Sequence, residues 1–273
     1  MNLATTDTLP DASCQVTAWR HGLAAVETME TVVEEVPVAL VYNGISHAVL
    51  LASPMDLEDF ALGFSLAEGI LDRAADLYDI EVRHSAQGIS LQLQIASGAM
   101  HALKLRRRSL AGRTGCGLCG TESLEQVART VRAVPSGGVV SAPALHAAMA
   151  ALKESQVLHR ATGAVHAAGW ASWDGRLQLA REDVGRHNAL DKLIGALAGQ
   201  RHDTADGFAI VTSRASYEMV QKAAAAGIRL LAAISAPTAM AVRLAEHSGV
   251  TLAGFVRQDR QVVYAHAQRV RMD

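Results

Sequence analysis

A chain of 273 residues, half of them hydrophobic, has enough apolar side chains for one large domain or two modest ones. Its net charge of −2 argues against a general affinity for nucleic acid or acidic membranes. Three cysteines are too few for a disulfide scaffold, and the N-terminus has neither the basic nor the apolar part of a secretory signal. We therefore expect a soluble cytoplasmic protein.

The N-terminal third predicts a small α+β unit behind a tail. The first dozen residues are polar and without pattern, and we expect residues 1–27 to be flexible. Asn43 and Gly44 separate two apolar runs and predict a hairpin, because both residue types tolerate positive φ. Ser53 then predicts the N-cap of a helix. Residues 28–105 are therefore expected to form a small domain.

The remainder of the chain predicts an α/β domain. An arginine- and glycine-rich segment, residues 106–120, breaks the pattern and is expected to be a mobile loop. Residues 121–273 then alternate short apolar strands with amphipathic helices. This alternation predicts right-handed crossovers and a largely parallel sheet covered by helices.

The loop contains the most reactive residues of the sequence. Cys116 and Cys119 form a C-x-x-C motif flanked by Gly115, Gly117 and Gly120. The glycines leave the backbone mobile, and the arginines just before the motif favour the thiolate form of a cysteine. Such a thiolate can attack a persulfide on one partner and present the sulfur to another acceptor. The second cysteine could resolve or protect the first.

Two other interpretations of the cysteine pair are less favoured. A structural zinc site needs four ligands, and only Cys14 remains elsewhere, with no histidine pair at ligand spacing, so no structural metal is expected. A thioredoxin-like pair is expected at a strand-to-helix turn rather than after an arginine-rich linker. Cytidine deamination needs H-x-E and P-C-x-x-C motifs, and both are absent from the sequence, which excludes that chemistry.

Residues 212–216, 235–238 and 254–257 each lie at the end of a predicted parallel strand. These three segments are expected to meet at the carboxyl edge of the sheet, where open α/β folds bind ligands. Their hydroxyls, helix N-termini and arginines suit a phosphate or pyrophosphate, and Phe255 could stack on a base. The alternative is that the hydroxyls are ordinary caps and the arginines face solvent. The candidate residues here are Ser213, Arg214, Ser235, Thr238, Phe255, Val256, Arg257 and Arg260.

A further polar stretch, residues 181–188, precedes an amphipathic helix. It could be catalytic, but capping and local salt bridges are the favoured interpretation. His166 lies in an apolar strand, so we expect a satisfied core histidine rather than a ligand.

Taken together, several motifs in one order resemble the FdhD family, the formate dehydrogenase accessory sulfurtransferases. The resemblance extends from about residue 28 to 263. The motifs that carry it are residues 115–120 (GCGLCG), 182–189 (EDVGRHNA), 212–214 (TSR), 235–238 (SAPT) and 254–257 (GFVR).

The resemblance implies a function and a site. Members accept sulfur from a cysteine desulfurase as a persulfide and pass it to the molybdenum bis-guanine-dinucleotide cofactor of formate dehydrogenase. Cys116 would carry the persulfide, with Cys119 as its companion. The larger domain would be a three-layer, cytidine-deaminase-like fold without zinc ligands, and the protein a homodimer. The matching cofactor-binding segment is Phe255, Val256, Arg257, Gln258, Asp259 and Arg260.

Two other functions stay open at this point. The chain could be a chaperone that shields and hands over the cofactor, with the cysteines secondary. Less favoured is a general dithiol oxidoreductase.

Overall fold

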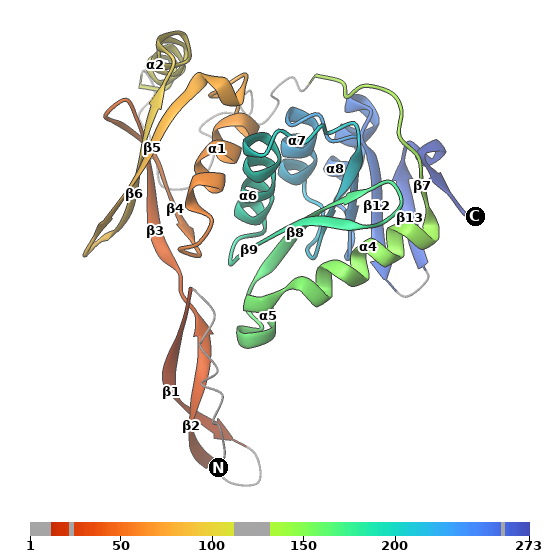
Figure 1. Cartoon of the computed structure of the whole chain (residues 1–273), viewed down its shortest axis with the longest axis horizontal. Coiled ribbons are helices and arrows are strands. Elements are labelled where there is room, and N and C mark those ends of the chain that lie inside the picture. Colours follow the sequence, from red (N-terminus) through yellow and green to blue (C-terminus); the bar gives the residue numbers. More distant parts are fainter. Residues whose placement is uncertain (1–11, 22–24, 112–131, 258–259) are drawn as a thin grey trace.

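The computed structural model describes residues 12–21, 25–111, 132–257 and 260–273. This part of the chain contains an N-terminal ribbon, a four-stranded sheet and a six-stranded sheet (Figure 1). Helices α1 (Leu57–Ala67) and α6 (Arg186–Gly199) lie between the two larger sheets and pack against each other.

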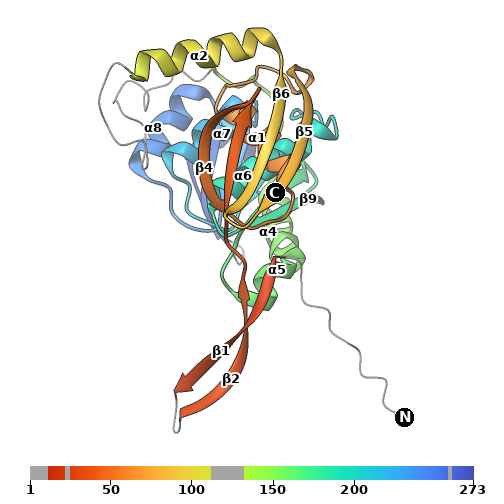
Figure 2. The same cartoon turned by 90° about the vertical axis from the view of Figure 1, so that its left-hand side faces the viewer.

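Most of the residues expected to form a flexible tail instead belong to a two-stranded ribbon. Strands β1 (Ser13–His21) and β2 (Ala25–Val33) pair antiparallel, and the ribbon extends away from the body of the molecule (Figure 2). The prediction that residues 1–27 are flexible is therefore wrong for the described residues from Ser13 onward. Most side chains on both faces of the ribbon are exposed or half-buried, so the sequence lacks the polar–apolar alternation that reveals a strand.

The four-stranded sheet follows directly, in the order β4-β3-β6-β5. Asn43 and Gly44 have φ values of 46° and 80°, which confirms the predicted hairpin turn. One face of the sheet packs against α1, with Leu40, Leu91 and Phe60 fully buried. The strands are β3 (Val36–Tyr42), β4 (Ile45–Ala52), β5 (Leu77–Ser85) and β6 (Gly88–Ile95).

Two local predictions in this region are wrong. Helix α1 begins at Leu57 after Asp56, which has a left-handed conformation, so Ser53 is not its N-cap. The expected loop at 106–120 begins too early, because helix α2 extends from Ser97 to Ala111. Lysine, leucine and arginine are good helix formers, which explains why the helix continues through the arginine-rich stretch.

The six-stranded sheet has the order β13-β12-β11-β10-β8-β9 and confirms the α/β class. Parallel pairing is confined to β10–β11 and β11–β12, so the sheet is mixed rather than largely parallel. Strands β8 and β9 form a hairpin, and β8 pairs antiparallel with β10, which the helix–strand alternation of the later sequence does not reveal. The strands are β8 (His166–Ser172), β9 (Leu177–Asp183), β10 (Gly207–Val211), β11 (Leu230–Ala233), β12 (Thr251–Arg257) and β13 (Arg260–Ala265).

Helices cover both faces of this sheet and form the expected three layers. Helices α6, α7 and α8 share one buried cluster with the sheet, and α4 shares the other. A short pair of parallel strands, β7 (Val140–Ser141) and β14 (Val270–Arg271), lies beside the main sheet. The remaining helices are α4 (Ala142–Ser155), α5 (Val157–Thr162), α7 (Tyr217–Ala225) and α8 (Ala239–Ser248).

Candidate functional site

The three segments predicted to meet at the carboxyl edge of β10, β11 and β12 do lie side by side. Ala215 and Pro237 form a parallel bridge, and the Thr238 N–H donates to the Ala215 carbonyl at 3.1 Å. The Phe255 N–H donates to the Ser235 carbonyl at 3.2 Å. Backbone hydrogen bonds therefore join the loops after β10 and β11 to each other and to the end of β12.

Two of the candidate hydroxyl groups in these loops have structural partners. The Thr238 side chain accepts from the Ala241 N–H at 3.2 Å and caps α8. The Ser213 hydroxyl is buried and donates to the Arg214 carbonyl at 3.0 Å. The interpretation as ordinary caps thus holds for Thr238, while the exposed Arg214 guanidinium stays accessible.

The end of β12 is bent, and its last residue, Arg257, is exposed. Phe255 has a φ of 54°, which is uncommon outside glycine and is often found at binding sites, and it lies in a bulge of the β12–β13 pairing. The Arg257 guanidinium lies 5.8 Å from the centre of the Phe255 ring, and Arg257 pairs in register with Arg260. Both arginines are exposed.

Three residues of the expected cofactor-binding segment have no side chain shown at the surface: Val256, Gln258 and Asp259. Val256 is fully buried in the core below α4, so its side chain cannot contact a ligand and only its backbone is available. Gln258 and Asp259 lie outside the described residues.

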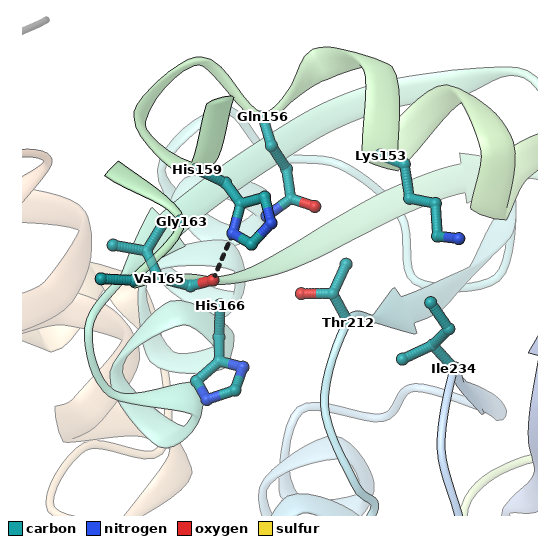
Figure 3. A pocket seen from close by; sticks show the side chains of 9 residues that line it. Lys153, Gln156, His159, Gly163, Val165, His166, Thr212 and Ile234 are labelled. Atoms are coloured by element: carbon teal, nitrogen blue, oxygen red, sulfur yellow. Dashed lines mark hydrogen bonds between the residues drawn. The ribbon is translucent and has the colours of Figure 1, made fainter. Parts of the chain in front are cut away.

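A pocket of about 530 Å³ opens at the same edge (Figure 3). Thr212 and Ile234 come from the ends of β10 and β11, and His166 is the first residue of β8. Of these residues, only His166 and Thr212 belong to segments that stand out in the sequence. The lining residues are Lys153, Gln156, His159, Gly163, Ala164, Val165, His166, Thr212 and Ile234.

His166 is a half-buried pocket residue, so the expectation of a core histidine is wrong. Burial lowers the pKa of His166 below its ordinary value of 6.5, and the nearby Arg186 charge lowers it further. The imidazole is therefore neutral at pH 7. As the pH falls below 6.5, protonation of His166 opposes folding, because the unfolded chain takes up the proton more readily.

We expect Arg186→Gln to raise the pKa of His166, because the substitution removes a positive charge beside the imidazole. An NMR titration of the His166 ring in both proteins measures the change. An unchanged or lower pKa in the variant would show that burial alone sets the protonation of this residue.

Residues 181–188 form a largely buried structural network, which confirms the expected salt bridges. The expected cap is not found, because α6 begins after Gly185 without a side-chain cap. The Asp183 carboxylate lies 2.7 Å from the Lys192 ammonium, and both side chains are fully buried. Asp183 also accepts from the Ser53 N–H at 3.0 Å, which links the four-stranded sheet to the larger sheet. Glu182 accepts from the Leu158 and His159 N–H groups at 2.9 Å and thereby holds α5 beside the pocket.

The cysteine motif cannot be placed in this geometry, because Cys116 and Cys119 lie outside the described residues. The described chain stops at Ala111, the last residue of α2, and resumes at Arg132. There, the Val134 N–H donates to the carbonyl of Ser248, the last residue of α8. Within the described ranges, no group of three or more His, Cys, Asp or Glu is arranged to hold a metal ion.

The fold and this edge define the class of protein: a mixed α/β protein with exposed arginines at the carboxyl edge of its parallel strands. The FdhD/NarQ family model matches residues 33–271, and the chain belongs to this family.

Similar proteins cover almost the whole chain. The sulfur carrier protein FdhD of Cupriavidus necator is 62% identical over 255 residues, which are 93% of this chain and 88% of that protein. The protein of the same name from Bordetella petrii is 55% identical over 96% of this chain and 94% of its own length. A crystal structure of a candidate formate dehydrogenase accessory protein from Desulfotalea psychrophila superposes with a TM-score of 0.75 at 25% identity, covering 95% of this chain and 99% of that one. Among the described helices, none is long and apolar enough to span a membrane.

Proposed function

We propose that this chain accepts sulfur as a persulfide on Cys116 and delivers it to the molybdenum bis-guanine-dinucleotide cofactor destined for formate dehydrogenase. A cysteine desulfurase is the proposed donor, and Cys119 assists Cys116. The relatives that are named sulfur carrier proteins, and the structural neighbour described as a formate dehydrogenase accessory protein, support this proposal.

The first step is an exchange of sulfur–sulfur bonds. The Cys116 thiolate attacks the outer sulfur of a persulfide on the donor, and the donor cysteine leaves as a thiolate. One sulfur–sulfur bond forms as another breaks, so the step needs neither an oxidant nor a reductant. The reactive form is the thiolate, which the arginines before the motif favour.

The observation that carries the cofactor part of the proposal is the junction of three loops at the carboxyl edge. Arg214, Arg257 and Arg260 are exposed there, and Phe255 offers an aromatic face beside Arg257. Guanidinium groups bind phosphates through paired N–H donors, and an aromatic ring can stack on a purine. A guanine dinucleotide has both groups.

Val134 is hydrogen-bonded to Ser248 just before the start of β12, at the end of the strand opposite this edge. The proposal requires the Cys116 sulfur, which lies outside the described residues, to reach the carboxyl edge.

Guanosine diphosphate, a fragment of the cofactor, is expected to bind to the carboxyl edge. Arg257→Ala should weaken its affinity about tenfold, the loss expected for one charge-assisted contact of ~1.4 kcal/mol. Isothermal titration calorimetry measures both affinities. Arg176→Ala is the matched control, because Arg176 is an exposed arginine beyond the turn between β8 and β9, at the opposite end of these strands.

Failure of guanosine diphosphate to bind the unaltered chain would contradict the nucleotide assignment. An Arg257→Ala protein with full affinity would remove the segment after β12 from the proposed site.

A further inference from the structure

Helix α2 carries a concentrated positive charge. Lys104, Arg106, Arg107 and Arg108 lie on this helix, and none of its 15 residues is an aspartate or glutamate. The helix alone therefore has a net charge of +4, whereas the whole chain has a net charge of −2. Lys104 and Arg108 are four positions apart, a spacing at which like charges destabilise a helix. The cluster costs free energy in the isolated chain, and an acidic partner would offset that cost.

The structure leaves this part of α2 open to a partner. Met100 and Leu103 anchor the first half of the helix, since both side chains are buried in the core of the four-stranded sheet. The next two residues face solvent. Lys104 is exposed and has no ion-pair partner within the described chain, and Leu105 is 51% exposed. Figure 2 shows α2 lying across one end of the four-stranded sheet, at the margin of the molecule.

The three consecutive arginines extend this surface around the helix. Successive positions of an α-helix are about 100° apart, so Arg106, Arg107 and Arg108 cannot all lie on the face that packs against the sheet. The sequence therefore places further positive charge beside the exposed Lys104 and Leu105. We call residues 104–108 the basic stretch of α2.

The cysteine motif is tied to this basic stretch by a short length of chain. Helix α2 ends at Ala111, and Cys116 follows five residues later. An extended chain covers at most about 3.6 Å per residue, so the Cα atom of Cys116 lies within about 18 Å of the Cα atom of Ala111. A protein that hands sulfur to Cys116 must therefore approach the basic end of α2.

We infer that the basic stretch of α2 is the docking surface for the protein that donates sulfur to Cys116, and that this donor presents an acidic surface to it. Opposite charges steer the donor to the helix and raise the association rate. Leu105 adds an exposed apolar side chain to the centre of the contact. The inference rests on the proposed persulfide transfer and adds the surface that recognises the donor.

The rate of sulfur transfer from a cysteine desulfurase to Cys116 tests this inference. The triple variant Arg106→Gln, Arg107→Gln, Arg108→Gln removes three charges and keeps a good helix former at each position. It should slow the transfer about tenfold at low salt, because the association loses its electrostatic steering. The difference from the unaltered chain should shrink at high salt, which screens exposed charges in both proteins.

Two single variants complete the comparison. Lys104→Glu reverses a charge further from the cysteines and should also slow the transfer in a salt-dependent way. Arg176→Glu is the matched control, because it reverses an exposed charge beyond the turn between β8 and β9. This control should accept sulfur at the rate of the unaltered chain.

A neutral small reagent separates docking from the other role that arginines beside a cysteine can have, which is to favour the thiolate. Iodoacetamide reacts with the thiolate without docking, and mass spectrometry follows its addition to the peptide that contains Cys116. Docking predicts nearly the same alkylation rate in the triple variant and in the unaltered chain. If alkylation and sulfur transfer were slowed by the same factor, the arginines would act through the thiolate and the docking surface would be wrong.

The remaining outcomes separate this inference from the proposed function. If both α2 variants accepted sulfur from the desulfurase at the rate of the unaltered chain, the docking surface would be wrong and the persulfide transfer would stand. If the unaltered chain accepted no sulfur from the desulfurase, both would be wrong.

Discussion

Formate dehydrogenase produced together with the Cys116→Ala variant is expected to have no more activity than the enzyme produced without this chain. Alanine removes the sulfur atom that is proposed to carry the persulfide, and position 116 lies outside the described residues. The measurement is formate oxidation by the purified dehydrogenase, compared between cells that contain the variant and cells that contain the unaltered chain.

Cys14→Ala is the matched control for that experiment. Cys14 lies on β1, and its hydrogen bond with Glu34 raises the pKa of its thiol, which disfavours the reactive thiolate. We expect this variant to support full activity. A fully active dehydrogenase with Cys116→Ala would favour a chaperone that shields and hands over the cofactor, and persulfide transfer would then be wrong.

The second large effect is a loss of stability, which is expected for substitution of a glycine where α1 crosses α6. A Cβ atom added to Gly195 would lie 1.8 Å from the Asp59 carbonyl oxygen, and one added to Gly63 would lie 1.7 Å from the Asp191 carbonyl oxygen. Because both obstacles are backbone atoms, the two helices would have to separate. Gly195→Ala should therefore lower the free energy of unfolding by roughly 3 kcal/mol or more, measured by urea denaturation.

Gly98→Ala provides the comparison. Gly98 lies in α2 with nothing within 4 Å of an added Cβ atom, so alanine there should be neutral or stabilise the protein by up to about 1 kcal/mol. If Gly195→Ala unfolded at the same urea concentration as the unaltered protein, the close helix crossing described here would be wrong. The crossing fixes the position of the four-stranded sheet relative to the larger one, so it supports the whole arrangement.

The sequence predicts those elements that are specified by residues close together in the chain. Asn43-Gly44 specifies its hairpin through the φ values that both residues tolerate. The alternation after residue 207 predicts three parallel strands, and their order along the chain places the loops at 212–216, 235–238 and 254–257 on one edge. That part of the candidate site follows from periodicity and from the rule that parallel strands end together.

The other features depend on contacts between distant residues. Ser53 looks like a helix cap in its local context, but its N–H group binds Asp183, 130 positions further along the chain. His166 lies in an apolar run, yet it begins its strand at the edge rather than in the core. Gln156 has no motif around it, and only the packing of α4 and α5 shows that its side chain is buried beside the pocket.

Mass spectrometry of the chain after incubation with a cysteine desulfurase and cysteine tests the central claim most directly. The proposed function predicts one added sulfur atom on the peptide that contains Cys116, and no addition at the corresponding position of the Cys116→Ala variant. A plain disulfide between Cys116 and Cys119, without added sulfur, would contradict the persulfide relay and indicate a dithiol oxidoreductase.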